Sequence, residues 1–250
     1  ECTLLDRVAS GIELTESGQR LYDYANTVLS EYDKLKKEID IIRASEEGTV
    51  ELLVAYDILR YLTPDCILEF QKKYPNVTFS YMEYPDRIVE KMLLDKEGNV
   101  ALSIGPFAGD CFDMKSLKKC SLGLLVYEGH SLAKKREATI LDLEGEPLYL
   151  ENSSFKLNEF IQSRCWNRGF EPDIVFETNG FDLCYKMCRL KRGISVTIDF
   201  VHEDMNTEGL VMIPFAEDDM IWEIGLLTLK DRAMESSVEK FYKYIENYHN

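Results

Sequence analysis

The chain has 250 residues, with 29 Lys and Arg against 45 Asp and Glu, a formal charge of −16 and a hydrophobic fraction of 45 %. A chain of this length and composition can bury a hydrophobic core as one large or two modest domains, which excludes a mainly disordered protein. Its negative charge argues against binding of a polyanion by this chain alone. No run of roughly 18 apolar residues is present, so neither a spanning helix nor a membrane partner is expected.

The clearest periodic signal lies in residues 16–44, where apolar side chains follow one another at alternating steps of four and three. Thr15 stands at the N-cap position, and Gly48 follows as a stop signal. The pattern predicts a long helix that dimerises as a coiled coil, with an amphipathic helix lying on its own domain as the alternative. The predicted dimerisation residues are Leu21, Ala25, Val28, Tyr32, Leu35, Ile39 and Ile42.

Beyond Gly48, short apolar runs alternate with amphipathic segments. Such alternation predicts an α/β protein with parallel strands, right-handed crossovers and helices on both faces of the sheet. The predicted strands are 50–56, 77–83, 100–104, 122–127, 147–150, 174–177, 194–198, 211–215 and 221–229. The predicted helices are 64–73, 86–95, 158–168, 181–192 and 235–248.

Seven cysteines form no CxxC pair, and only three histidines are present. We therefore expect no metal and no cofactor. An odd number of cysteines without a signal peptide is typical of reduced thiols in the cytoplasm, where most act as small buried side chains. Cys184 and Cys188 stand four apart on a predicted helix, either as core residues or as a redox pair.

Three segments resemble LysR-type transcriptional regulators. In residues 4–18, Leu-Leu-Asp-Arg followed by Gly-Ile-Glu-Leu-Thr-Glu-Ser-Gly resembles the family's wing, where Leu-Thr-x-x-Gly enters a long helix. Residues 67–77 (ILEFQKKYPNV) and 169–177 (GFEPDIVFE) resemble two segments of the family's sensing domain. The resemblance spans essentially the whole chain.

The resemblance implies two doubly wound subdomains of the type-2 periplasmic-binding-protein kind, joined by two crossover strands and preceded by the dimerising helix. It implies a wing remnant of the winged helix-turn-helix at 1–14, a linker helix at 15–46 and an effector-binding domain at 47–250. Subdomain I would comprise about 48–120 and 200–250, and subdomain II about 121–199. DNA would be bound mainly by an N-terminal domain missing from this chain. Arg7 either touches a backbone phosphate or is a solvated surface charge.

The implied function is that of the effector-sensing and oligomerisation portion of a DNA-binding regulator. It would bind a small metabolite between its lobes and shift the geometry of a homodimer or homotetramer. The alternatives are a solute-binding protein of a transporter and a natural fragment that dimerises with full-length copies. The sequence carries no nucleophile elbow, phosphate loop, HExxH or GxGxxG motif, so we expect no enzyme.

In doubly wound sheets, ligands bind where the carboxyl ends of strands meet. The predicted effector-binding residues are Tyr56, Asp57, Pro85, Asp86, Ser153, Ser154, Phe155, Asp199 and Phe200. Two carboxylates there would repel an anion, so we expect a small polar effector that is not a simple dicarboxylate, with Asp57 and Asp199 accepting its donors. Arg60 could neutralise Asp57, and either Asp could instead cap the helix that follows it.

Overall fold

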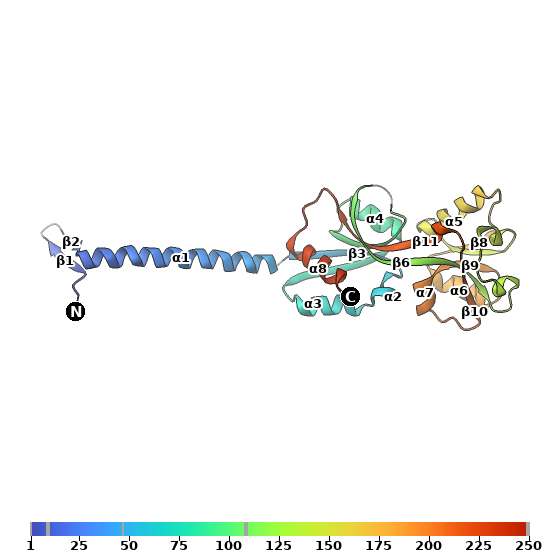
Figure 1. Cartoon of the computed structure of the whole chain (residues 1–250), viewed down its shortest axis with the longest axis horizontal. Coiled ribbons are helices and arrows are strands. Elements are labelled where there is room, and N and C mark those ends of the chain that lie inside the picture. Colours follow the sequence, from blue (N-terminus) through green and yellow to red (C-terminus); the bar gives the residue numbers. More distant parts are fainter. Residues whose placement is uncertain (1, 9–10, 47, 108–109, 249–250) are drawn as a thin grey trace. The chain divides into compact units, whose positions relative to one another are not determined.

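The computed structural model describes residues 2–8, 11–46, 48–107 and 110–248. The chain divides into two compact units, residues 1–48 and 49–250. Both units are drawn in Figure 1.

The first unit is an antiparallel pair of strands followed by one long helix. Strand β1 (Leu5–Val8) pairs with β2 (Gly11–Leu14), and α1 runs over Glu16–Glu46. As predicted, Thr15 caps the helix: its Oγ1 accepts the main-chain N–H of Gly18 at 3.0 Å. A Cβ at Gly18 would lie 2.0 Å from the Leu4 carbonyl oxygen, so only glycine fits where the chain before β1 crosses the start of α1.

Helix α1 leaves its apolar edge uncovered in the single chain. Every position from Gln19 to Lys36 is exposed, including Val28 at 65 % and Tyr32 at 64 %. Leu21, Ala25, Leu35 and Ile39 are exposed on the same helix, and the side chain of Ile42 lies outside the described part. Arg7 lies exposed on β1, opposite Ile12.

The second unit contains two lobes, of which the first is formed by strands β3 (Gly48–Ala55), β4 (Val77–Tyr84) and β5 (Val100–Gly105). Helix α4 (Asp86–Leu94) lies on one side of these strands, and α2 (Ile58–Leu62) and α3 (Asp65–Lys73) lie on the other (Figure 1). Helix α8 (Ser236–Glu246) packs on α3 through Phe241, whose ring centroid lies 5.0 Å from that of Phe70.

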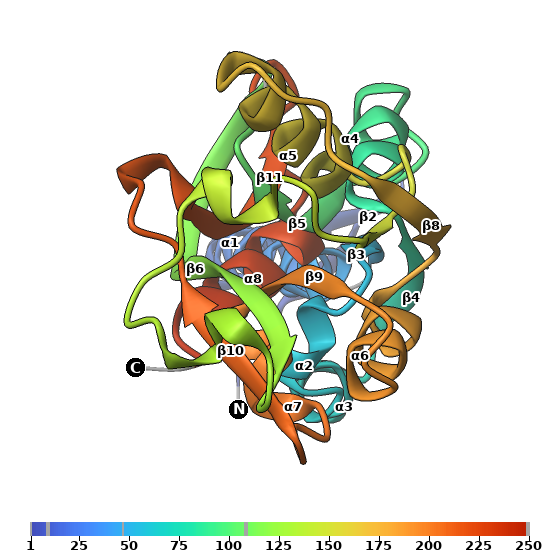
Figure 2. The same cartoon turned by 90° about the vertical axis from the view of Figure 1, so that its right-hand side faces the viewer.

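The second lobe contains β7 (Leu148–Glu151), β8 (Ile174–Thr178), β9 (Ile194–Ile198) and β10 (Leu210–Pro214). Helices α5 (Lys156–Asn167) and α6 (Phe181–Arg189) lie on opposite sides of these strands (Figure 2), and α7 (Asp199–Asp204) follows β9 directly. Strands β7 and β9 are wholly buried, as expected of parallel strands covered on both faces. Short 3₁₀ turns cover Ser131–Lys134, Ile140–Leu143 and Asp218–Met220.

Two long strands connect the lobes. Strand β6 (Phe112–Tyr127) pairs with β11 (Ile221–Leu229) up to Ser121, and from Leu122 onward it pairs with β9 and β10. Across the described residues, the strands of the second unit form one mixed sheet in the order β4-β3-β5-β11-β6-β9-β7-β8, with β10 also paired to β6. The two expected crossover strands are therefore β6 and β11.

The structure differs from the predicted elements at two short helices, at the start of β6 and at the return to the first lobe. Helices α2 and α7 are too short to give a periodic signal and were not predicted. Strand β6 begins at Phe112 rather than 122, and its first half was not predicted because it is mostly polar and little buried. We expected the return to subdomain I at about residue 200, but β10 still pairs with the second-lobe half of β6 and the return is made by β11.

The cysteines of the predicted helix 181–192 are buried in the second lobe. Cys184 is 1 % and Cys188 0 % exposed, and Cys188 Sγ donates to the Leu125 carbonyl at 3.6 Å. Burial raises the pKa of Cys184 to about 11 and also raises the pKa of Cys188. Both observations favour the core interpretation over the redox pair. Among the described helices, none is both long and apolar enough to cross a bilayer.

Candidate ligand-binding site

The ends of strands from both lobes converge on one small cavity. The carboxyl ends of β3, β5, β7 and β9 meet there with the first turns of α4, α5, α6 and α7, as expected of doubly wound sheets. The cavity measures about 20 Å³, close to the volume that one water molecule needs. Its lining residues are Ala55, Tyr56, Asp57, Asp86, Ile104, Glu151, Phe155, Leu157, Phe181, Ile198, Phe200 and Trp222.

The structure brings five of the nine predicted effector residues together around this cavity. Tyr56 and Asp57 come from the end of β3, Asp86 from the start of α4, and Phe155 and Phe200 from the second lobe. The rings of Tyr56 and Phe155 face each other across the lobes, with centroids 6.1 Å apart. The carboxyl-end rule therefore selected five residues that line one cavity, and their role in binding an effector stays a prediction.

The other four predicted residues are not among those lining the cavity. Pro85 precedes α4, and Ser153 and Ser154 lie in the turn before α5. Asp199 points elsewhere: its Oδ1 accepts the main-chain N–H of Phe200 at 2.6 Å, and its Oδ2 accepts that of Ser121 at 2.9 Å. Ser121 is the residue at which β6 passes between the lobes, so Asp199 fastens the crossover strand.

Asp57 is held by an ion pair rather than by capping. Its backbone is left-handed, with φ 69°, and its side chain makes no cap to α2. Instead, Oδ1 accepts from Nε of Arg60 at 2.5 Å, the neutralising contact expected from their spacing. Burial raises the pKa of Asp57, and the bond from Arg60 opposes that rise.

Arg60 also connects the lobes. Its Nη1 donates to Asp204 on α7 at 2.6 Å, and its Nη2 lies 3.7 Å from Asp182 on α6. These residues line a groove of about 510 Å³ that shares Tyr56 and Asp57 with the small cavity. The groove therefore adjoins the interlobe site.

Asp86 links the two lobes on the opposite side of the cavity. Its Oδ1 accepts the main-chain N–H of Lys156, the first residue of α5, at 3.0 Å. The side chain of Lys156 then pairs with Glu90 of α4 and donates to the Ile104 carbonyl at 2.9 Å. Burial raises the pKa of Asp86 to about 6, although Lys156 lowers it.

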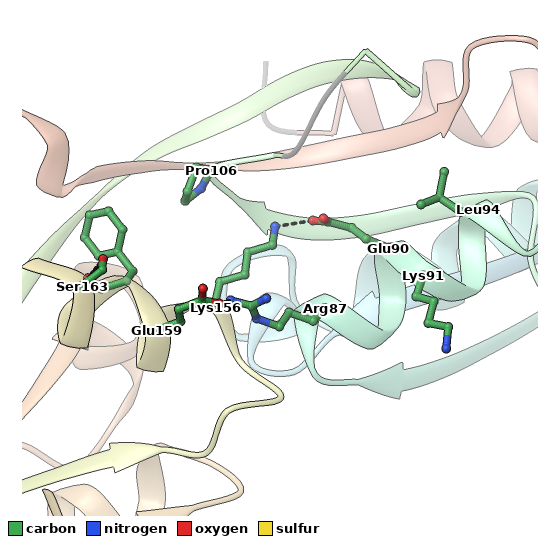
Figure 3. Close-up of a pocket in the computed structure, with 9 residues that line it drawn as sticks. Arg87, Glu90, Lys91, Leu94, Pro106, Lys156, Glu159 and Ser163 are labelled. Carbon is green, nitrogen blue, oxygen red and sulfur yellow. Dashed lines mark hydrogen bonds and ion pairs between the residues drawn. The ribbon is translucent and has the colours of Figure 1, made fainter.

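A second groove, of about 450 Å³, lies over this link. Figure 3 shows Lys156 extending from the start of α5 toward Glu90 on α4, with Arg87 directed at Glu159. Ser103 Oγ also donates to Glu90, at 3.1 Å. The contact between α4 and α5 is thus a network of charges from both lobes.

Sequence reasoning missed the most deeply buried carboxyl of the cavity. Glu151 ends β7 and is 4 % exposed, and its Oε1 has no hydrogen-bond partner among the described residues. Burial raises its pKa well above the ordinary value, and the charges of Asp57 and Asp86 raise it further. The available signal was a charged residue directly after the apolar run 147–150, one position before the loop chosen from the strand-end rule.

Trp222 was also missed. It lies on β11 and is 3 % exposed, and its Nε1 has no acceptor in the described part of the chain. Its ring packs edge-on against Phe160, with centroids 5.2 Å apart. Only the pairing of β11 with β6 brings this residue to the cavity, and that pairing is not visible in the sequence.

Comparison with known proteins agrees with the two-lobed architecture. Over residues 43–249 the chain matches the family model described as the LysR substrate binding domain. An uncharacterised HTH-type transcriptional regulator of Bacillus subtilis, YwbI, is 25 % identical over 74 % of this chain and 62 % of its own length. The transcriptional dual regulator GltC of the same organism is 24 % identical over 97 % of this chain and 81 % of its own length. The chain thus spans less than two thirds of the first relative.

Two solved structures show the same fold. The effector-binding domain of BenM with its effector benzoate superposes with a TM-score of 0.66 at 19 % identity, covering 80 % of this chain and 90 % of that one. Full-length CbnR complexed with target DNA gives a TM-score of 0.63 at 16 % identity, covering 100 % of this chain and 85 % of that one. Since the family model covers most of the sequence, the chain belongs to the family of LysR substrate-binding domains.

Proposed function

We propose that this chain is the effector-sensing and oligomerisation portion of a LysR-type transcriptional regulator, which acts in the cytoplasm and contains a winged helix-turn-helix for DNA. The observation that carries the proposal is the cavity at the junction of two lobes, where Tyr56 and Asp57 of one lobe face Phe155 and Phe200 of the other. A ligand bound there touches both lobes at once and therefore acts on their relative geometry.

The relatives support a regulator more than a transport protein or an enzyme. YwbI and GltC are named as transcriptional regulators, and the CbnR structure contains target DNA. No corresponding observation favours the solute-binding alternative. We accordingly propose a small-molecule effector and DNA as the partners of the whole protein, with Arg7 of the β1–β2 pair as a backbone phosphate contact.

The proposed mechanism is a shift between two arrangements of the lobes. The bond from the Lys156 N–H to Asp86 and the ion pair from Arg60 to Asp204 hold the described arrangement from two sides. An effector that enters between them favours the arrangement in which it makes more contacts. The linker helices would pass this change to the homodimer and, through the lobes, to a homotetramer.

Helix α1 is proposed as the dimerisation element. At about 1.5 Å per residue, its 31 residues extend roughly 46 Å, and a lone helix of this kind is marginal in water. Its exposed apolar edge, from Leu21 to Ile39, would gain stability from a second copy. Such an edge predicts an association that depends on protein concentration.

The dimer is tested by sedimentation velocity of the chain and of Val28→Asp at micromolar concentration. A charge introduced at this edge should raise the dimer dissociation constant at least a hundredfold, because the interface would bury it unpaired. Asn26→Asp, which places the same residue on another face of α1, should leave the dimer intact. A monomeric wild-type chain would contradict the proposed oligomer.

The effector site is tested by a thermal-shift screen of a metabolite library containing neutral, anionic and cationic compounds. A ligand at 100 times its dissociation constant stabilises the folded state by about 2.7 kcal/mol, which raises Tm by several degrees. Replacement of Phe155 by Ala should reduce the shift from any genuine hit, since Phe155 lies in the cavity wall. If no metabolite stabilises the chain, the proposed sensing function fails.

A further inference from the structure

Two polar atoms on the cavity wall are buried without partners. Glu151 Oε1 and Trp222 Nε1 make no hydrogen bond within the described chain, and their residues are 4 % and 3 % exposed. Buried polar atoms in folded proteins are nearly always paired, and each exception needs an explanation. Here the two residues that carry one free acceptor and one free donor both line the same interlobe cavity. The pair is suited to a ligand that supplies one donor and one acceptor.

The charges around the cavity favour a positive donor. Three carboxyls line it, and two of them already have partners: Asp57 pairs with Arg60, and Asp86 accepts from the Lys156 N–H. Glu151 accepts nothing at Oε1. A carboxylate in such surroundings binds a cation by a charge-assisted hydrogen bond, whereas an anion would be repelled by three groups at close range.

Five aromatic and four aliphatic residues make up the rest of the wall. Tyr56, Phe155, Phe181, Phe200 and Trp222 surround the three carboxyls. Aromatic faces attract organic ammonium groups and pack against a carbon skeleton. A strongly hydrated metal ion would gain little from such a wall, so the surface fits an organic cation better.

The groove next to the cavity also has an excess of negative charge on its wall. The adjoining groove, which shares Tyr56 and Asp57 with the cavity, has five charged residues on its wall: Asp57, Arg60, Glu83, Asp182 and Asp204. The only cation among these lining residues, Arg60, contacts three of the four acids. A groove with an excess of carboxylates concentrates cations and speeds their entry.

We propose that the effector is a small organic cation: a protonated amine on a compact, partly apolar body that also carries one hydrogen-bond acceptor. The ammonium group binds the Glu151 carboxylate, and the acceptor receives the Trp222 Nε1–H. This inference rests on the proposed sensing function and specifies the ligand class of the same site. It is opposite in charge to benzoate, the effector named for BenM.

The size of the cavity links binding to lobe movement. Its volume of about 20 Å³ admits little more than one water molecule. A ligand of several heavy atoms therefore has to part the lobes or replace the contact between Tyr56 and Phe155. Binding of the cation is thus coupled to the geometry that the regulator would use as its signal.

The test compares two sets of compounds that differ in charge on one skeleton. The small set is ethanolamine, ethylene glycol and glycolate, and the aromatic set is benzylamine, benzyl alcohol and benzoate. Each is titrated into the 250-residue chain at pH 7 by thermal shift and calorimetry, with Mg²⁺ as an inorganic comparison. At least one amine should bind and raise Tm, and it should bind at least tenfold more tightly than the alcohol and the carboxylate of its set.

Variants then assign the contacts. Glu151→Gln should weaken amine binding at least tenfold, because it removes the charge while keeping the shape. Glu144→Gln, at an exposed position outside the cavity, should change nothing. Trp222→Phe should weaken the binding of ethanolamine, whose hydroxyl is a hydrogen-bond acceptor, more than the binding of benzylamine, which has no acceptor. This contrast does not depend on Glu151→Gln being folded.

Tighter binding of glycolate or benzoate than of the amines would overturn the proposed charge while leaving a small-molecule sensor in place. The proposed charge would also be overturned if Mg²⁺ but none of the amines stabilised the chain, or if Glu151→Gln bound the amines as tightly as the wild type does. If none of the six compounds binds, the inference fails. A hit elsewhere in the metabolite library would then show that the sensing function stands without it.

Discussion

The carboxylate of Asp86 in the first lobe accepts the main-chain N–H of Lys156 in the second, with 3.0 Å between Oδ1 and the nitrogen. Lys156 is the first residue of α5, where main-chain N–H groups have no partner within the helix. A carboxylate at that end also complements the helix dipole. One side chain thus satisfies a helix terminus and joins two lobes.

Replacement of Asp86 by Ala should loosen this junction. The Lys156 amide should exchange its hydrogen faster, and the free energy of unfolding should fall by about 1 kcal/mol, since part of the bond's strength is offset by desolvation of the carboxyl. Amide exchange followed by NMR checks both. Asp65→Ala, which removes an exposed acid from the first turn of α3, is the matched control. Unchanged protection of Lys156 would show that Asp86 does not hold the lobes together.

The stability of the chain should respond to pH through Glu151. Its pKa in the folded protein lies above the ordinary value of 4.5, so between these two values the folded state binds more protons than the unfolded state. Stability contributed by this group is therefore lost as pH rises above about 4.5. Glu151→Gln has no carboxyl at this position to titrate and so does not show this loss. In urea unfolding from pH 4.5 upward, the free energy of unfolding of the variant should therefore rise relative to that of the wild type. A constant difference across this range would mean that Glu151 titrates normally.

Arg60→Gln should destabilise the chain by about 2 kcal/mol at pH 7, because it leaves Asp57 buried without its cation. The pKa of Asp57 is already raised by burial, and loss of Arg60 would raise it further. The destabilisation should therefore shrink as the pH falls and Asp57 becomes protonated. Urea unfolding at several pH values measures this trend. Arg20→Gln, which breaks the fully exposed pair with Glu16 on α1, should have almost no effect.

Gly18→Ala should detach the segment before β1 from the start of α1. The added Cβ would lie 2.0 Å from the Leu4 carbonyl oxygen, which also accepts the Thr15 N–H at 3.1 Å. Amide exchange at Thr15 should accelerate at least tenfold, because the backbone has to move away. Ser17→Ala, at the neighbouring exposed position, should leave Thr15 protected.

Periodic patterns predicted most of the fold. Apolar residues spaced alternately by four and three positions predicted α1. Short apolar runs predicted most strands of both lobes to within a few residues. The short helices α2 and α7 were missed because five or six residues carry no usable period. The first half of β6 was missed because its side chains are polar, and its place in the sheet depends on pairing with a strand about 100 residues later in the chain.

The candidate site was predicted only in part, for a related reason. The strand-end rule finds Tyr56, Asp57 and Asp86, which follow their strands directly. It does not say which way a side chain points, and Asp199 turns to Ser121 instead of the cavity. Trp222 lies within a strand, and Glu151 is the last residue of one, so neither belongs to a loop that the rule examines.

Strand β6 passes through both lobes with one register shift, opposite Ile224 and Gly225 of β11, and this course limits how the protein can vary. One added or deleted residue in the middle of the strand would turn every later side chain to the opposite face, exchanging core for solvent throughout the pairing with β9 and β10. Substitutions along residues 112–127 are therefore tolerable where insertions are not. Among related chains, the number of residues in this segment should stay constant while the residue types change.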